Sequence, residues 1–187
     1  MVHLYLVRHG ETEENVAGIL QGHLPGRLTE RGREQARQLR DVLGGTSFDA
    51  LYVSDLRRTL ETAEILNGAL HLPLTPEPLL RERDWGELTG RRIADIDTHC
   101  FPPSVESVEH LFRRAAAFID KLLREHDGQR VLAVSHGLFS RALQACYNAS
   151  TIHNTPRMAN GEVRHLEILH PVRLTTAEDQ ETGASAN

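Results

Sequence analysis

Residues 2–10 read VHLYLVRHG, an apolar run that ends in an arginine, a histidine and a glycine. A near-continuous apolar run of this length is typical of a strand buried on both faces. A second such run, residues 131–137, reads VLAVSHG and also ends in a histidine before a glycine. Ligands of open α/β sheets bind beyond the carboxyl ends of the strands. If these two strands are neighbours, we expect His9 and His136 to face each other at such a site.

The rest of the chain alternates predicted strands with predicted helices, which indicates a layered α/β fold. The further strands are expected at residues 50–53, 72–75 and 162–169, the last with the apolar–polar alternation of an edge strand. The helices are expected at residues 29–43, 56–70, 105–125 and 138–147. Residues 9–28 are predicted to be a loop, because glycines and a proline interrupt them repeatedly.

Length and composition predict a single domain. The chain has 187 residues, of which 40% are hydrophobic, and no repeat or linker divides it. We expect the domain to span residues 1–174. Within it, residues 83–104 are expected to form a short cap over the site. Residues 175–187 are small and polar, which predicts a disordered tail.

Charge and cysteine content narrow the partners and the compartment. The net charge of -5 argues against a general nucleic-acid surface. No signal peptide or membrane span is recognisable, and Cys100 and Cys146 lie outside any CxxC pair. We therefore expect a cytoplasmic protein with free thiols, no nucleic-acid partner and no membrane partner. Both a monomer and a homodimer stay open.

The run Arg8-His9-Gly10 indicates anion chemistry with a histidine nucleophile. A glycine after the histidine lets the backbone turn tightly and approach a ligand. The guanidinium of Arg8 offers forked donors that match phosphate oxygens. Taken alone, a histidine in a loop is more often a surface or structural residue.

Two further stretches fit the same chemistry. Residues 54–63, SDLRRTLETA, open a helix, and helix N-termini bind anions. Arg57 and Arg58 lie about 100° apart on that helix, so only one of them can point at a given site. In residues 80–86, LRERDWG, a carboxylate could protonate a leaving group if burial or a bound phosphate raised its pKa. The alternatives are solvated arginines and an exposed salt-bridge cluster.

Together these motifs resemble the histidine phosphatase superfamily, which includes the cofactor-dependent phosphoglycerate mutases and many small phosphatases. The motifs around residues 8–10, 54–63, 80–86 and 135–137 occur in the order of that family. Further matches are Asn15, residues 21–22 and the pattern in residues 28–36. The resemblance covers residues 2 to about 169. It implies a three-layer α/β/α sandwich with a mostly parallel central sheet, of the phosphoglycerate mutase-like type.

The resemblance also implies a role for each matching residue. His9 would become phosphorylated, His136 would stabilise the transferring phosphoryl group, and Glu82 would give a proton to the leaving oxygen. The residues expected to bind phosphate are Arg8, Asn15, Arg58 and Gly137. Those expected to contact the rest of the substrate are Gln21, Gly22, Arg83 and Trp85. No metal and no cofactor is required, because arginines and His136 can neutralise the charge.

The subtype follows from the cap. Residues 82–90, ERDWGELTG, are similar to the mutase branch. However, the segment from Gly90 to the next helix is shorter than in the mutases, and Ile93 stands where a mutase places a lysine. In addition, the asparagine that often follows the second His-Gly of the family is Leu138 here. We therefore predict a metal-independent phosphomonoesterase of the histidine acid type, which acts on a small phosphorylated substrate through a phosphohistidine intermediate. The alternative is a phosphoglycerate mutase that depends on 2,3-bisphosphoglycerate. A non-catalytic phospho-ligand binder and a metallohydrolase are the rivals from other classes.

Overall fold

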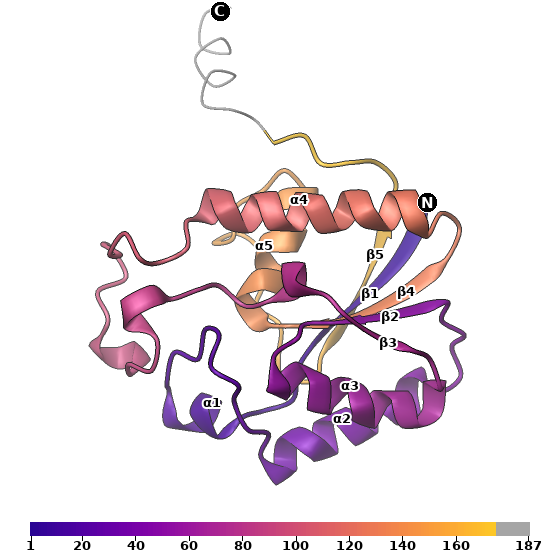
Figure 1. The fold of residues 1–187 in the computed structure, drawn as a ribbon, viewed down its shortest axis with the longest axis horizontal. Helices are drawn as coiled ribbons and strands as arrows, with labels where there is room; N and C mark the ends of the chain where they lie inside the picture. Colours follow the sequence, from indigo (N-terminus) through magenta and orange to yellow (C-terminus); the bar gives the residue numbers. More distant parts are fainter. Residues whose placement is uncertain (175–187) are drawn as a thin grey trace, which may run out of the picture.

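The computed structural model describes residues 1–174 and places a five-stranded sheet at the centre of the molecule (Figure 1). The strand order is β3-β2-β4-β1-β5. These strands are β1 (Val2–Arg8), β2 (Ala50–Val53), β3 (Leu74–Pro76), β4 (Arg130–Ser135) and β5 (Val163–Ile168). All neighbouring pairs are parallel except β1 and β5, which run antiparallel. The predicted mostly parallel sheet and the predicted edge strand are confirmed.

Helices cover both faces of this sheet, as the predicted three-layer sandwich requires. Figure 1 shows α4 (Val108–Glu125) and α5 (Gly137–Tyr147) on one side, and α2 (Glu30–Leu43) and α3 (Arg57–Leu70) on the other. Alternate residues of β1 serve the two layers. Leu4 and Leu6 pack in the α4/α5 core, whereas Val7 packs in the α2/α3 core. This burial on both faces explains why β1 and β4 read as continuous apolar runs.

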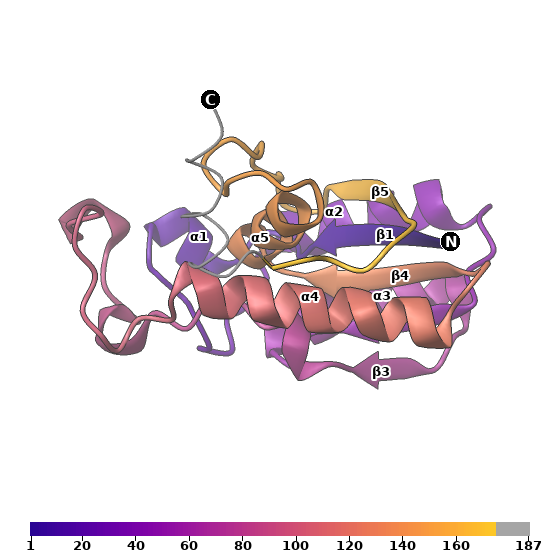
Figure 2. The same cartoon turned by 90° about the horizontal axis from the view of Figure 1, so that it is seen from above.

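The pairing of β1 with β4 decides where the site lies. In their register Arg8 is opposite Ser135, so the residues that follow, His9 and His136, leave the sheet side by side. The expected neighbourhood of the two histidines is therefore confirmed. The cap, residues 83–104, extends from this edge of the sheet and lies at the opposite end of the molecule from the N-terminus (Figure 2). It holds two 3-10 turns, Gly86–Leu88 and Ile93–Asp95, and a third, Pro78–Leu80, precedes it.

The prediction of a loop over residues 9–28 was wrong in one part. Residues Glu13–Ala17 form the short helix α1, whose side chain and backbone hydrogen bonds between Thr12 and Asn15 make a capping box. Gly18 ends the helix in the left-handed conformation. Five residues are too few to show a helical period, so only the capping residues Thr12 and Asn15 could have revealed this helix. The cap segment pairs with its end, since the backbone of Ile93 donates to the carbonyl of Gly18 at 2.8 Å.

Two elements begin more than one residue away from the predicted position. The helix expected from residue 105 begins at Val108, because Ser107 caps it through the backbone N–H of His110. The strand expected at 72–75 is β3, Leu74–Pro76, at the edge of the sheet, where a proline is tolerated. No helix within residues 1–174 has the length and apolar character needed to cross a membrane. The predicted tail, residues 175–187, lies outside the described residues.

Candidate active site

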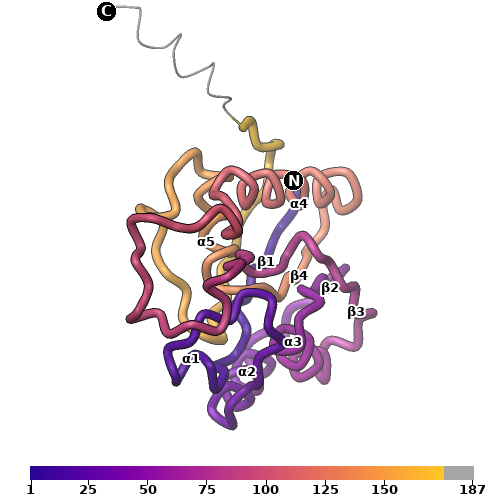
Figure 3. The backbone as a smooth tube through the Cα atoms, turned by 60° about the vertical axis from the view of Figure 1, so that its left-hand side comes forward, coloured from indigo at the N-terminus to yellow at the C-terminus, as the bar shows by residue number. Residues whose placement is uncertain are grey.

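A pocket of about 360 Å³ opens beyond the carboxyl ends of β1 and β4. Figure 3 shows α1, the cap and the chain that follows α5 grouped at this end of the molecule. The walls combine arginines with apolar side chains. The lining residues that were predicted as site residues are Arg8, His9, Asn15, Gln21, Gly22, Arg58, Glu82, Arg83, Trp85 and Gly137. Of the predicted set, only His136 is not a lining residue.

His9 is fixed with one ring nitrogen free for chemistry. Its Nδ1 lies 2.7 Å from the carbonyl oxygen of Gly10, and because a carbonyl can only accept, Nδ1 carries the proton. The neutral ring therefore presents an unprotonated Nε2. Burial, together with the nearby positive charge of Arg58, lowers the pKa of His9 to about 3. The imidazole is thus neutral, and nucleophilic, at physiological pH.

Gly10 holds this turn in place through backbone packing. A Cβ at Gly10 would lie 2.3 Å from the carbonyl oxygen of Gly32, at the start of α2. Its backbone N–H also donates to Thr62 Oγ1 on α3, at 3.1 Å. Hence no larger residue fits after His9, and the turn is braced by both helices of one layer.

His136 lies directly behind His9. The two imidazole centroids are 5.3 Å apart at 65°, and the His136 ring is fully buried. Its Nδ1 accepts from Arg58 Nε at 3.2 Å, so its Nε2 carries the proton and donates to Ser54 Oγ at 2.7 Å. Burial lowers the pKa of His136 well below that of a free imidazole. Both ring nitrogens are therefore engaged with protein groups rather than directed at the pocket.

Arg58 links this histidine to the pocket wall. Its guanidinium donates to the carbonyl oxygens of Leu24 at 2.5 Å and Gly22 at 2.7 Å, besides His136. Burial lowers the pKa of Arg58 to about 10, so the side chain stays charged at neutral pH. Arg57, its neighbour on α3, is exposed, as the angular argument predicts. The carbonyl oxygens of Leu24 and Gly22 thus keep the buried, charged guanidinium of Arg58 at the wall of the pocket.

Arg8 enters the pocket from β1 with spare hydrogen-bonding capacity. One terminal nitrogen donates to the carbonyl oxygen of Met158 at 2.6 Å, and its buried Nε has no partner in the described part of the chain. A buried donor without a partner is costly unless a ligand satisfies it. Gly137 makes this position possible, because a Cβ there would lie 2.9 Å from Arg8 Nε.

Asn15 is oriented by its neighbours on two loops. Its Oδ1 accepts from the backbone of Thr12 at 3.0 Å and from Asn160 Nδ2 at 3.2 Å. Asn160 also donates to the carbonyl oxygen of His9 at 3.1 Å. Because the carbonyl end of the Asn15 amide is used twice, its NH₂ end is left to donate into the pocket.

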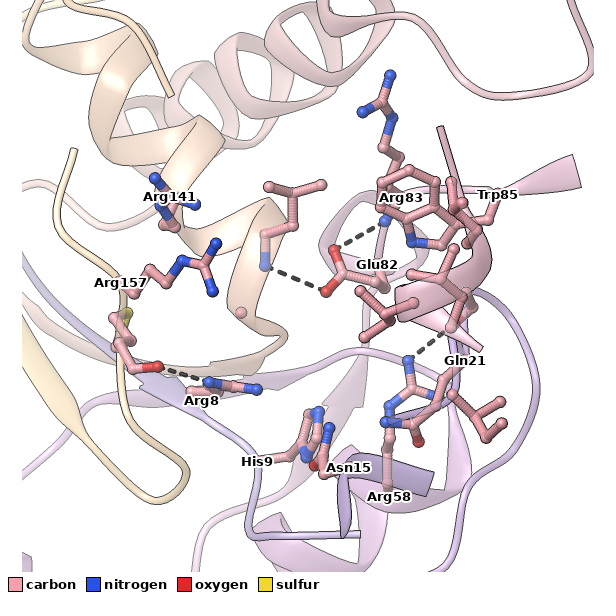
Figure 4. A pocket seen from close by; sticks show the side chains of 18 of the residues that line it. Arg8, His9, Asn15, Gln21, Arg58, Glu82, Arg83, Trp85, Arg141 and Arg157 are labelled. Carbon is pink, nitrogen blue, oxygen red and sulfur yellow. Dashed lines mark hydrogen bonds between the residues drawn. The ribbon is translucent and has the colours of Figure 1, made fainter. Parts of the chain in front are cut away.

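Glu82 faces the pocket from across it (Figure 4). Its carboxylate sits at the start of α5, where it accepts from the backbone of Leu138 at 3.1 Å and Phe139 at 2.9 Å. The backbone of Arg83 donates to it as well, at 2.8 Å. The carboxylate is therefore fixed in position by three backbone donors.

The four residues predicted to contact the remainder of the substrate all line the pocket, but they differ in how far protein groups already occupy their polar atoms. The backbone of Gly22 is used to hold Arg58. Gln21 is buried, and its Oε1 has no hydrogen-bond partner within residues 1–174. Arg83 donates to the carbonyl oxygen of Glu106 at 2.7 Å and lies over the ring of Trp85, 4.7 Å from its centroid. It is thus held mostly by protein groups.

Several lining residues are not predicted from the sequence. Two are the arginines Arg141, on α5, and Arg157, in the loop after it. The others are mostly apolar: Ile19, Leu20, Ile93, Ile96, Thr98, Phe101, Leu138 and Met158. The arginines carry no motif, and only the position of Arg141 one turn after His136-Gly137 could have pointed to it. Within residues 1–174, no three His, Cys, Asp or Glu side chains are grouped as a metal site.

Comparison with known proteins yields one family. The model of the histidine phosphatase superfamily, branch 1, matches residues 4–172. An adenosylcobalamin/α-ribazole phosphatase of Escherichia coli K12 is 34% identical over 147 residues, 71% of this chain and 72% of the relative. A probable phosphoglycerate mutase of Proteus mirabilis is 34% identical over 178 residues, 88% of this chain and 80% of the relative.

A solved structure extends the likeness to the whole fold. A mycobacterial glucosyl-3-phosphoglycerate phosphatase superposes with a TM-score of 0.80 at 28% identity, covering 88% of this chain and 92% of the other. The names of these relatives include phosphatases and a mutase, so they support phosphatase chemistry without deciding the substrate. With a family model that spans nearly its whole described length, this chain belongs to the histidine phosphatase superfamily, branch 1.

Proposed function

We propose that this protein hydrolyses a small phosphate monoester through a phosphohistidine intermediate and without a metal ion. One observation carries the proposal: the free Nε2 of a neutral His9, two arginines and the carboxyl of Glu82 converge on one pocket. Phosphoryl transfer is largely a matter of positioning and charge stabilisation. Arg8, Arg58 and the NH₂ group of Asn15 supply donors for the phosphoryl oxygens.

In the first step His9 Nε2 attacks phosphorus. The N–P bond forms as the ester P–O bond breaks, and Glu82 gives its proton to the leaving oxygen. In the second step water attacks phosphorus while Glu82 takes its proton. The N–P bond breaks, inorganic phosphate leaves, and His9 and protonated Glu82 are regenerated. We assign His136 to stabilising the transferring group. Its bond to Arg58 supports that role, because it orients a phosphate-binding guanidinium.

Hydrolysis rather than mutase transfer is favoured by the walls of the pocket. A mutase must keep water away from its phosphohistidine. Here the cap is short, and its pocket-lining residue Ile93 is 52% exposed.

The free thiols Cys100 and Cys146 fit the cytoplasm that we propose as its location. Candidate substrates are sugar phosphates, nucleotides, α-ribazole phosphate and phosphoglycerates. α-Ribazole phosphate matches the name of a phosphatase relative, and phosphoglycerate that of a probable mutase.

The direct test is to assay the purified protein against a panel of phosphate monoesters. We expect release of inorganic phosphate that EDTA leaves unchanged and that vanadate, a five-coordinate mimic of the transferring group, inhibits. Activity that disappears in EDTA and returns with a divalent ion would overturn the metal-independent mechanism. Binding of phosphate esters without turnover of any would favour the non-catalytic binder.

The mutase alternative needs a separate assay. The protein is supplied with 3-phosphoglycerate, with and without 2,3-bisphosphoglycerate, and both 2-phosphoglycerate and inorganic phosphate are measured. Hydrolysis predicts phosphate release with negligible 2-phosphoglycerate. Rapid isomerisation that depends on the bisphosphate, with little phosphate released, would make the protein a mutase.

A further inference from the structure

The pocket holds more positive charge than one phosphate needs. Five arginines line it, and Glu82 is the one acidic residue among the lining side chains of residues 1–174. Arg8 and Arg58 flank His9 and are assigned to the scissile phosphate. Arg83 is stacked on Trp85 and bonded to the carbonyl oxygen of Glu106. The two arginines on the opposite side, Arg141 and Arg157, have no part in this scheme (Figure 4).

Arg141 shapes the loop that follows α5. Its guanidinium donates to the carbonyl oxygens of Thr155 at 3.0 Å and Ile152 at 2.6 Å. The next residues of the same loop are Arg157 and Met158, and the carbonyl oxygen of Met158 accepts from Arg8. The chain that carries Arg157 is therefore tied at both sides, to α5 through Arg141 and to β1 through Arg8.

The side chain of Arg157 itself is free to bind. It is exposed, and within the described residues no hydrogen bond or ion pair holds its guanidinium. Figure 4 shows it pointing into the pocket between Arg141 and Arg8. Burial lowers the pKa values of Arg8 and Arg141, and the positive charge of Arg157 lowers both further. Like charges gathered in this way, with no salt bridge to a carboxylate within the described residues, favour the binding of an anion.

We propose that Arg157, on the loop fixed by Arg141, binds a second anionic group of the substrate. The inference rests on the proposed function and narrows it: the substrate is a phosphate monoester that also carries a carboxylate or a second phosphate. Figure 4 shows Arg157 on the side of the pocket away from Glu82, so an anion bound to Arg157 would leave the carboxyl of Glu82 accessible to the departing oxygen. The apolar cap residues then contact the uncharged part of the molecule.

Three esters with the same three-carbon skeleton test this. Glycerol 3-phosphate has no second anion, 3-phosphoglycerate has a carboxylate, and glycerol 1,3-bisphosphate has a second phosphate. We expect wild-type kcat/KM to be roughly 10-fold to 100-fold higher for at least one anionic ester than for glycerol 3-phosphate, the range of one charge-assisted contact. The ester that shows the higher value identifies the kind of anion.

The variant Arg157→Gln should remove this preference, lowering kcat/KM for the anionic ester roughly 10-fold to 100-fold and for glycerol 3-phosphate less than 3-fold. Arg157→Lys should keep part of the preference. The matched control is Arg124→Gln, which removes one exposed charge near the far end of α4 and should change neither value. It separates a local contact from the loss of net charge.

Two results would overturn the inference and can be told apart. Hydrolysis of p-nitrophenyl phosphate with equal kcat/KM for the three esters, or a preference that persists in Arg157→Gln, contradicts the second subsite alone. Absence of hydrolysis of every ester, p-nitrophenyl phosphate included, overturns the proposed function and the subsite with it.

Discussion

The two sides of the pocket differ in how firmly their side chains are fixed. At the strand ends, His9, Arg58 and His136 are at most 3% exposed and each is hydrogen-bonded to protein groups. On the loop side, Arg157 is exposed and Ile93 is 52% exposed. His9 and His136 follow strands of the central sheet and Arg58 belongs to helix α3. Arg157 and Ile93 belong instead to segments that connect the main helices and strands.

This difference separates chemistry from selection. Groups that stabilise a transition state act best when they are fixed before the substrate arrives. Buried strand ends provide this, because their backbone is held by neighbouring strands. Loops tolerate changes of sequence and length, so a family can alter its substrates there without disturbing the reaction. Changes at the strand ends should therefore affect every substrate alike, and changes on the loops should depend on the substrate.

The largest effect is expected for His9, the proposed nucleophile. His9→Ala should lower kcat by at least ~10³-fold on every ester, because the phosphohistidine route is removed. Rapid quench with labelled substrate should trap acid-labile phosphate on the wild-type protein. The same label on His9→Ala would show that another residue is the nucleophile. Circular dichroism should show an unchanged fold, which keeps the loss of activity attributable to chemistry.

Glu82 should come next, with an effect that depends on the leaving group rather than on substrate binding. Glu82→Gln cannot donate a proton, and general acid catalysis is worth roughly 10²-fold to 10⁴-fold. We expect a loss in this range for alkyl phosphates and a much smaller loss for p-nitrophenyl phosphate, whose leaving group needs little protonation. The exposed Glu64→Gln on α3 is the matched control. Equal losses on both esters would instead indicate that Glu82 only caps α5.

The same division explains what the sequence could predict. Buried parallel strands are read from apolar runs, and histidines that follow such runs are placed by the sheet itself, as His9 and His136 are. Arg58 is placed by the start of α3. These residues share a short stretch with the element that positions them, so local pattern and family resemblance both find them.

The loop side could not be predicted because its residues are brought in by contacts distant in sequence. Arg157 lies on a loop whose carbonyl oxygens accept hydrogen bonds from Arg141 on α5, Arg8 on β1 and Arg164 on β5. The bonds that occupy both nitrogens of His136 were equally hidden, because Ser54 and Arg58 belong to another strand–helix unit. Helix α1 was missed for a different reason, its length of five residues.

A smaller effect is expected where the strand-end side is most tightly packed. Gly137→Ala places a Cβ 2.9 Å from Arg8 Nε, and Arg8 is tied to Met158, so the guanidinium must shift. We expect kcat/KM to fall roughly 10-fold to 100-fold on all esters, the value of one charge-assisted contact. Gly45→Ala, where an added Cβ meets nothing within 4 Å, should leave activity unchanged. A loss confined to esters with a second anionic group would indicate that Arg8 selects the substrate rather than binding the scissile phosphate.

Burial of the nucleophile also predicts a pH dependence of stability. Burial lowers the pKa of His9 from 6.5 to about 3. Between these values the unfolded chain binds a proton that the folded chain does not, so the free energy of unfolding falls as pH falls below 6.5. Above pH 6.5 this contribution is absent. Between pH 6.5 and 5 the free energy of unfolding should therefore fall by about 1–2 kcal/mol less for His9→Gln than for the wild type. Urea unfolding at both pH values measures it, and parallel losses would contradict a buried neutral imidazole.

The smallest effect is expected on the cap, where it should depend on the substrate. Ile93 lines the pocket while half exposed, and its tie to α1 runs through its backbone, so Ile93→Ala keeps that tie. Losing part of an apolar contact should raise KM for 1-naphthyl phosphate roughly 2-fold to 5-fold, with kcat unchanged. Glycerol 3-phosphate, which has little apolar surface, should show no change. Val42→Ala, exposed on α2, is the control. A fall in kcat on both esters would mean that the cap takes part in the chemistry, and the division between the two sides of the pocket would fail.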